Sequence, residues 1–270
     1  MKIDRVLLSV NNNKTYSCFW NLVSYVWKTK FNVTPTLIFH GTEDEFKSNQ
    51  FDFTYGDYIL LEKFNDISNN TKDWSTTWSP FYAATLFDEE ICMTSGIDQI
   101  PISNLFFERI KNINNDMFVI GFSECYENYK PNTLGYFNTK TNVMYPSSHL
   151  AGSGQKFKDI FGISDNWRDE IYKVYNSKEK YYLSENNWGL DECYFSEKIS
   201  IYSNQTEIVY LKELTDFWFK NRIDVDGDIN ANYTLDNVKL GLYSELTTKN
   251  YFSYENTIKD VINNINNFNI

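Results

Sequence analysis

The sequence of 270 residues contains two histidines, four cysteines and no long hydrophobic run. The two histidines, His40 and His149, argue against a zinc site built on imidazole ligands. No apolar stretch approaches the roughly 20 residues that span a membrane, and the apolar run near the start is too short for a signal peptide. We therefore expect a cytoplasmic protein with no membrane span.

Disulfide patterns and basic clusters are also missing. Cys18, Cys92, Cys125 and Cys193 are widely spaced and form no Cys-x-x-Cys pair, which is typical of free thiols in a reducing compartment. Asp and Glu number 36 against 25 Lys and Arg, and the formal net charge is -11. Because binding to nucleic-acid phosphates needs a basic face, we expect no nucleic-acid partner. Nothing in the sequence indicates an oligomeric state.

Hydrophobic residues make up 42% of the chain and aromatic residues 18%, which is ample for a core, and aromatic faces also suit sugar rings. Short apolar runs typical of strands alternate with stretches of helical periodicity. The expected strands are 5–10, 34–41, 57–63, 91–95, 117–124, 199–203 and 207–212. The expected helices are 15–28, 79–87 with Pro80 in the first turn, 155–161 after a glycine-rich turn, one from near Leu190, and 254–268. This alternation predicts an α/β fold with a mostly parallel sheet.

Polar residues follow two of the expected strands. Asn11 and Asn12 come after the first strand, and Gly96 to Asp98 follow the strand at 91–95. In α/β sheets, ligands bind beyond the carboxyl ends of the strands. The sequence therefore predicts a ligand site that includes both segments.

The order of several motifs resembles that of the GT-A fold glycosyltransferases, most closely the small enzymes found in large viruses, phages and bacteria. The similar segments cover most of the chain: "SVNNNKTYSCFW", "LFDEEICMTSGIDQIPIS", "NNWGLDECYF", "FWFKNRID" and "KNYFSYENTI". In the family, the second segment ends its strand with Asp-x-Asp, and the third ends a Trp-containing loop with an acid at a helix start.

The resemblance implies a single GT-A (Rossmann-like) domain over 1–270, with a smaller mixed region on the acceptor side. Its parts would be a nucleotide-sugar-binding half at 1–110, an acceptor-binding half at 111–215 and a C-terminal helical extension at 216–270. The implied activity is transfer of a sugar from a nucleotide-sugar donor to a glycan or other hydroxyl acceptor.

Six residues are candidates for donor binding. Asn11, Asn12 and Tyr16 would bind the base and ribose, while Ser95, Gly96 and Asp98 would lie at the diphosphate. Asp98 could hold Mn²⁺ or Mg²⁺, because such ions keep several waters and need few protein carboxylates. Other interpretations remain open: Asn12 and Asn13 as a turn and helix cap, and Asp98 as the cap of a turn before Pro101.

The candidates on the acceptor side are two acids and three neighbours. Asp191, or else Glu192, could accept the proton of the acceptor hydroxyl as a general base. Trp188, His149 and Gly152 would line the acceptor site. Alternatively, Asp191 caps a helix and Glu192 complements the helix dipole.

The chain departs from the family pattern at three places. Gly96 replaces the first acid of Asp-x-Asp, Pro80 falls where such enzymes often carry an arginine, and no histidine occurs near 243–248. The lost carboxylate predicts weakened metal binding. It also motivates an alternative function: a degenerate GT-A domain that binds a sugar or a protein and does no chemistry.

Overall fold

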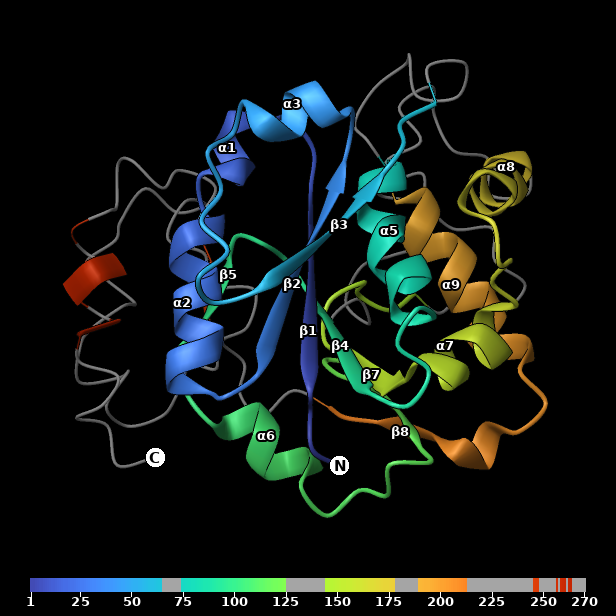
Figure 1. Ribbon diagram of the computed structural model, residues 1–270. Helices are drawn as coiled ribbons and strands as arrows, with labels where there is room; N and C mark the ends of the chain where they lie inside the picture. The colour runs from blue at the N-terminus through green and yellow to red at the C-terminus, as the bar shows by residue number, and fades with distance from the viewer. Residues whose placement is uncertain are drawn as a thin grey trace.

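The computed structural model describes residues 1–64, 74–124, 144–177, 189–212 and 245–247, and also Asn256, 258–260, 262 and 263. A seven-stranded sheet forms the centre of the molecule, in the order β3-β2-β1-β4-β7-β6-β8 (Figure 1). Its strands are β1 (Arg5–Val10), β2 (Thr34–His40), β3 (Asp57–Leu61), β4 (Ile91–Ser95), β6 (Phe118–Ile120), β7 (Leu150–Ser153) and β8 (Ile208–Tyr210).

The sheet is mostly parallel. β1 pairs in parallel with both β2 and β4, β2 with β3, and β6 with β8. β7 is the exception, since it runs antiparallel to its two neighbours β4 and β6. The expected α/β class with a mostly parallel sheet is therefore confirmed.

Helices cover both faces of the sheet (Figure 1). Successive side chains of β1 point to opposite faces, so both faces need cover. Val6, Leu8 and Val10 pack into a core with α2, whereas Leu7 packs into a second core with α5. The helices are α1 (Lys14–Ser17), α2 (Trp20–Lys30), α3 (Glu43–Lys47), α5 (Trp74–Ala84), α6 (Leu105–Ile110), α7 (Gly154–Phe161), α8 (Trp167–Asn176), α9 (Leu190–Ile201) and the 3-10 turn η2 (Gln205–Glu207).

Pro80 lies inside α5 and not in its first turn, which corrects the expectation from the sequence. A proline inside a helix cannot donate to the carbonyl four residues earlier, here that of Thr76. The Ser79 hydroxyl donates to that carbonyl at 2.7 Å, so the lost hydrogen bond is replaced. Almost every residue of α5 is buried, and packing against the sheet and three other helices further offsets the cost.

Several other elements differ from the sequence-based expectation. The first expected helix is two helices, α1 and α2, with Cys18 and Phe19 between them. The strand expected at 199–203 is wrong, because Ile199 continues α9 and is buried against its neighbours. α3, α6 and α8 were not expected, and neither was the small sheet of β5 (Gln99–Pro101) with β9 (Glu245–Thr247).

The glycine-rich turn expected before α7 is strand β7, which leads directly into the helix. Its glycines serve close packing. A Cβ at Gly152 would lie 2.7 Å from the Phe118 ring, and one at Gly154 would lie 2.4 Å from the Ala84 carbonyl oxygen. Ser153 caps the helix by accepting from the Lys156 N–H. The glycines here are thus explained by packing.

The part of the chain after Lys212 is described at few residues. Ile258 and Ile262, which the sequence placed on one helical face, are buried against the β1 and α2 side of the sheet, and 258–260 are helical. Val261 and Ile265 lie outside the described residues. Cys18, Cys92 and Cys193 are free thiols, and Cys125 is not described. Within the described ranges, no helix has the length and apolar character to cross a membrane.

Candidate functional site at the carboxyl edge of the sheet

Chain order reverses between β1 and β4, since β2 and β3 lie on one side of β1 and β4 lies on the other. In open α/β sheets a crevice forms at such a point, beyond the carboxyl ends of the strands. Leu8 of β1 pairs with Ser95 of β4, so Asn11 and Asp98 follow adjacent strands at the same edge. The two segments predicted to share a site are therefore neighbours in the fold. This edge lies toward the top of Figure 1, where α1 and α3 are drawn.

The loop after β1 is held by side-chain amides. The Asn11 side chain accepts from the Asn13 N–H at 3.0 Å, and Asn13 caps α1 by accepting from the Thr15 N–H at 3.0 Å. Asn12 is exposed, and its side-chain oxygen accepts from the Asn49 amide at 3.0 Å. Asn13 is thus a helix cap, and Asn12 is bonded to the segment that follows α3.

Tyr16, the third predicted contact to the nucleotide, lies on α1. It is half-buried and packs against the core on the α2 side. Tyr16 therefore lies on the helix that directly follows the asparagine loop.

The turn after β4 is organised around Gly96. Its N–H donates to the Gln99 side-chain oxygen at 2.6 Å, and its carbonyl accepts from the Gln99 N–H at 3.1 Å. A Cβ at position 96 would lie 2.8 Å from Asp98 Oδ1 and 2.9 Å from Gln99 Oε1. The side chains of Asp98 and Gln99 therefore occupy the space that a side chain at position 96 would take.

These residues fit a divalent cation poorly. The described parts of the chain contain no group of three or more His, Cys, Asp and Glu side chains that could hold a metal ion. At the end of β4, Asp98 is half-buried and supplies one carboxylate. One carboxylate can hold Mg²⁺ or Mn²⁺ when phosphate oxygens and water complete the shell. Any ion here would depend chiefly on the oxygens of a bound ligand.

We expect Gly96→Asp to strengthen metal binding. The atoms that a new Cβ would approach are ends of flexible side chains, so they can move aside, and a second carboxylate would add ligand oxygens beside Asp98. Titration calorimetry with Mn²⁺ should show affinity raised at least tenfold, about 1.4 kcal/mol. Gly96→Asn has similar volume without the charge and should leave the affinity unchanged. Equal Mn²⁺ affinity in the two variants would contradict this account.

Residues 145–150 are hydrogen-bonded both to β4 and to the start of α9. The Thr94 hydroxyl donates to the Ser147 carbonyl at 2.7 Å, and the Thr94 carbonyl accepts from the His149 N–H at 2.6 Å. On the other side, Glu192 Oε1 accepts from the Ser147 N–H at 3.1 Å. Glu192 therefore holds this segment in place, and the segment brings the start of α9 to the carboxyl edge.

His149 lies at this edge in a left-handed conformation, with φ of 62°. Phe122, just after β6, has φ of 52°, and the two rings meet edge-on with centroids 4.7 Å apart. Bulky residues rarely adopt this conformation, and such strain tends to concentrate at functional sites. His149 is 4% exposed and also contacts the Phe106 ring. His149 is thus buried near the carboxyl edge, in contact with the rings of Phe106 and Phe122.

Asp191 is the second residue of α9 and is 4% exposed. Burial raises the pKa of Asp191 to about 6 from its usual 3.8, because the charged form loses water. Hydrogen bonding with the Thr77 hydroxyl, which also donates to the Trp74 carbonyl at 2.8 Å, and with the N–H groups of Asp191 and Glu192 opposes that rise. A carboxyl with a pKa near neutrality, at a helix N-terminus, is suited to accept a proton.

The other two acceptor-side predictions do not join this group. Because β7 runs antiparallel to β4, the chain leaves the carboxyl edge after His149, and Gly152 pairs with Cys92 near the opposite edge. Gly152 is buried under Phe118. Trp188 lies outside the described residues.

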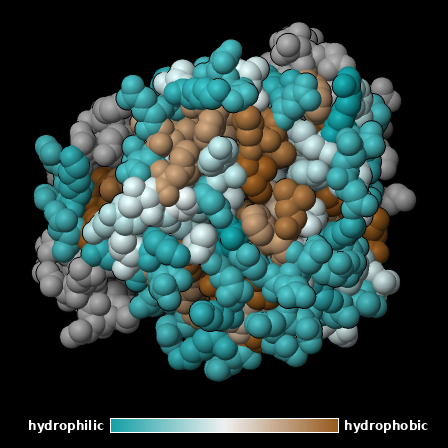
Figure 2. Space-filling model, viewed as in Figure 1, coloured by the Kyte–Doolittle hydropathy of each residue, from teal (hydrophilic) through white to brown (hydrophobic). Residues whose placement is uncertain are grey.

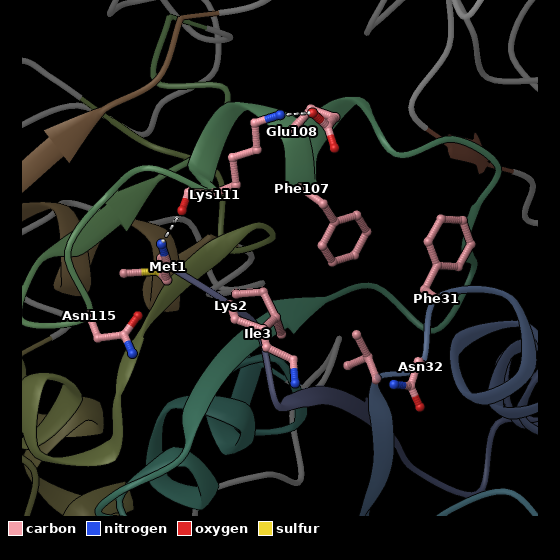
Figure 3. A pocket seen from close by; sticks show the side chains of 10 residues that line it. Met1, Lys2, Ile3, Phe31, Asn32, Phe107, Glu108, Lys111 and Asn115 are labelled. Carbon is pink, nitrogen blue, oxygen red and sulfur yellow. Dashed lines mark hydrogen bonds and ion pairs between the residues drawn. The ribbon is translucent and has the colours of Figure 1, made fainter. Parts of the chain in front are cut away.

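A separate hollow of about 450 Å³ lies at the amino edge, away from these residues (Figure 3). Phe31 and Phe107 line it with stacked rings 5.5 Å apart, and Lys2 and Lys111 lie at its rim. The Met1 ammonium donates to the carbonyls at the end of α6, among them that of Ile110 at 2.8 Å. These contacts fix the start of β1 on α6.

Sequence reasoning missed three residues of the candidate site. Thr77 contacts the Asp191 carboxylate from α5, Thr94 anchors 147–150, and Asn49 binds Asn12. All three contacts join residues 37 or more positions apart, so no local pattern marks them. A rule that seeks hydroxyls at the carboxyl ends of strands would have found Thr94.

No family model matches the chain. No curated protein matches it either. Among solved structures, it is similar to the galactosyltransferase LgtC in complex with donor and acceptor sugar analogues, with a TM-score of 0.48, 10% identity, and coverage of 76% of this chain and 72% of that one. The glycosyltransferase GlyE of Streptococcus pneumoniae gives 0.46 and 12%, over 85% of this chain and 49% of that one. The Mn/GDP form of core-mannan synthase A from Aspergillus fumigatus gives 0.43 and 11%, over 77% and 72%. Likeness at this level does not assign a function.

Proposed function

We infer that the protein is a glycosyltransferase of the GT-A type, which moves a sugar from a nucleotide-sugar donor to a glycan or other hydroxyl acceptor. The observation that carries this proposal is the meeting, at one carboxyl edge, of the asparagine loop, the Gly96–Asp98 turn and a buried Asp191 with a raised pKa. The order of motifs in the sequence supports the same assignment. Residues 1–110 would bind the donor, 111–215 the acceptor, and 216–270 would form an extension.

The donor would lie across the crevice between β1 and β4. Asn11, Asn12 and Tyr16 would contact the base and ribose. The turn at Ser95 to Asp98 would face the diphosphate, and Asp98 would hold any divalent ion together with the phosphates. Such an ion would supply charge stabilisation for the leaving nucleotide. Because the protein provides few ligands for it, we expect the dependence on metal to be weak.

The acceptor would bind on the α9 side. Asp191 would accept the proton of the attacking hydroxyl, with Thr77 fixing the orientation of the carboxylate. Since Asp191 is 4% exposed, the acceptor has to displace a neighbouring group to reach it. Glu192 would hold residues 145–149 in position through its hydrogen bond to Ser147. We assign no proton transfer to Glu192.

The test of this function is nucleotide release. Purified protein should release nucleotide from one class among UDP-, GDP-, dTDP- and CMP-sugars, faster when a panel of saccharide acceptors is present. Asp98→Ala should lower this turnover by about 10²–10³, the range for losing one group that stabilises developing charge. Asp98 is half-buried in a turn, so the variant should stay folded. Asp116→Ala, an exposed turn residue before β6, is the control and should retain full turnover.

A second candidate function rests on the Gly96 turn. The space that a side chain at position 96 would take is filled by Asp98 and Gln99, which is compatible with a GT-A domain that binds a sugar or a protein and does no chemistry. In that case nucleotide release would equal the buffer rate for every donor, with or without acceptors, and Asp98→Ala would have no turnover to lose.

A further inference from the structure

β3 forms the outer edge of the sheet. Among the described strands it pairs with β2 alone, through Asp57 to Leu61. Within the described residues, no strand pairs with its other side, where backbone N–H and C=O groups are directed away from β2. Natural proteins usually protect such an edge with charged side chains or proline, and in β3 only Asp57, at its start, is of this kind.

The same strand carries exposed hydrophobic surface. Tyr58 is 50% exposed and Leu60 is 36% exposed, although both are large hydrophobic residues. The Tyr58 ring lies 4.5 Å from that of Phe46 and 4.8 Å from that of Phe53, and both phenylalanines are only half-buried. In Figure 2 hydrophobic surface extends across the middle of this face, where β3 runs in Figure 1. A patch of this kind on an edge strand is typical of an interaction site.

Two of the charges that flank β3, Asp57 and Lys63, lie at equal distances from Leu60, and a third, Glu62, would lie opposite Tyr58 of a paired copy. Asp57 lies three residues before it and Lys63 three residues after it. A second copy of the strand, placed antiparallel with Leu60 opposite Leu60, would set each Asp57 across from a Lys63 of the other copy. Opposite charges across a strand pair are favourable, and like charges are not. Asp57 is also paired with Arg5 at 2.7 Å, which reduces the repulsion expected between two acidic chains at this edge.

We propose that β3 is a dimer interface, at which two copies of the chain pair antiparallel about a two-fold axis through Leu60. The pairing joins the two sheets into one and places the Tyr58–Phe46–Phe53 patches of the two copies next to each other on one face. Such an interface is isologous, so the same residues serve both partners. It lies on the outer strand of the sheet and does not depend on the proposed glycosyltransferase activity.

The first test is the molar mass in solution. Size-exclusion chromatography with light scattering should give twice the chain mass at high concentration, and Leu60→Lys should give the mass of one chain. Leu86→Lys and Ile201→Lys are matched controls, because these side chains are 52% and 61% exposed elsewhere, and both should remain dimeric. A wild-type protein of single-chain mass at every concentration would overturn the proposal, and so would a Leu60→Lys dimer as stable as the controls. The protein could instead have the mass of one chain at every concentration and bind an added strand peptide at β3. That result would indicate a different protein partner and would also overturn the dimer proposal.

The second test is the register. Directly opposed residues in an antiparallel pair have Cα atoms about 4.5–5.5 Å apart, within disulfide range. Leu60→Cys should therefore form a cross-linked dimer under mild oxidation. The two copies of residue 58 would be about 13 Å apart along the strands, so Tyr58→Cys should not cross-link above the wild-type background. Efficient cross-linking at 58 and none at 60 would refute the proposed axis.

Discussion

Asp191→Asn should lower turnover while making the protein more stable. As a general base Asp191 would contribute about 10²–10⁴ in rate, and an amide cannot accept the proton. The opposite effect on stability follows from the raised pKa. Burial penalises the carboxylate, and the neutral amide avoids that penalty while keeping the contact with Thr77.

The sign of the pH effect can be derived from the same shift. Between about pH 4 and pH 6 the folded protein holds the Asp191 proton more tightly than the unfolded chain, because the folded pKa is about 6 and the usual value is 3.8. The free energy of unfolding therefore falls as pH rises through this window, by about 3 kcal/mol in total, and the cost is constant above it. Turnover should rise across the same window, since the base acts in its ionised form.

The measurements are kcat on the preferred donor and Tm, both from pH 4 to 8. We expect Asp191→Asn to have a Tm a few degrees above that of the wild type at pH 8, and the two values to converge near pH 4. Asp116→Asn is the control, since Asp116 is exposed at the opposite edge, and should match the wild type in both. Unchanged turnover in Asp191→Asn would remove Asp191 from the mechanism, whereas a lower Tm at pH 8 would mean that the charge stabilises the fold.

Glu170→Ala should cause the largest loss of stability, about 3–5 kcal/mol. Glu170 on α8 is fully buried, and its carboxylate accepts from Trp78 Nε1 at 3.1 Å and from the Ser164 N–H at 2.8 Å. It also pairs with the Lys173 ammonium at 2.5 Å. Alanine would leave these donors without their acceptor in a dry environment, and each lost bond adds to the cost.

Urea denaturation of Glu170→Ala and Asp169→Ala measures this effect. Asp169 is the preceding residue on α8 but is exposed, so its variant should lose no more than about 1 kcal/mol. Glu170→Gln should fall between the two, because the amide oxygen can keep part of the network. Losses of equal size at 169 and 170 would show that α8 is sensitive at any position and that the buried network has no special weight.

Strands with continuous apolar runs were the most predictable part of the fold. Arg5–Val10 and Ile91–Ser95 form β1 and β4 with the expected bounds. Both strands are buried on both faces, and their sequences contain few polar residues. Strand β7 was not predictable, because "LAGSG" is typical of a glycine-rich turn and its extended form depends on Phe118 and Ala84 packing against those glycines. Pro80 misled for a similar reason: the Ser79 hydroxyl replaces the missing hydrogen bond, and that contact is invisible to helix propensity.

The candidate site was also predictable only in part. The carboxyl-edge rule placed Asn11 and Asp98 together because it depends on strand order, which the alternation of elements suggests. The roles within the site depend on long-range contacts. The sequence ranked Asp191 ahead of Glu192 only through the resemblance, whereas the structure buries the first beside Thr77 and bonds the second to Ser147.

Binding of a nucleotide sugar at the carboxyl edge is the central claim, and a thermal-shift panel tests it most directly. The wild type and Asp98→Ala would be heated with UDP-, GDP-, dTDP- and CMP-sugars, each with Mn²⁺, Mg²⁺ or EDTA. Ligand at about 100 times its Kd adds roughly 2.7 kcal/mol to the folded state. We predict that one nucleotide class raises the Tm of the wild type, that EDTA reduces the shift only in part, and that Asp98→Ala shows a smaller shift. No shift with any donor, or equal shifts in both proteins, would contradict the account.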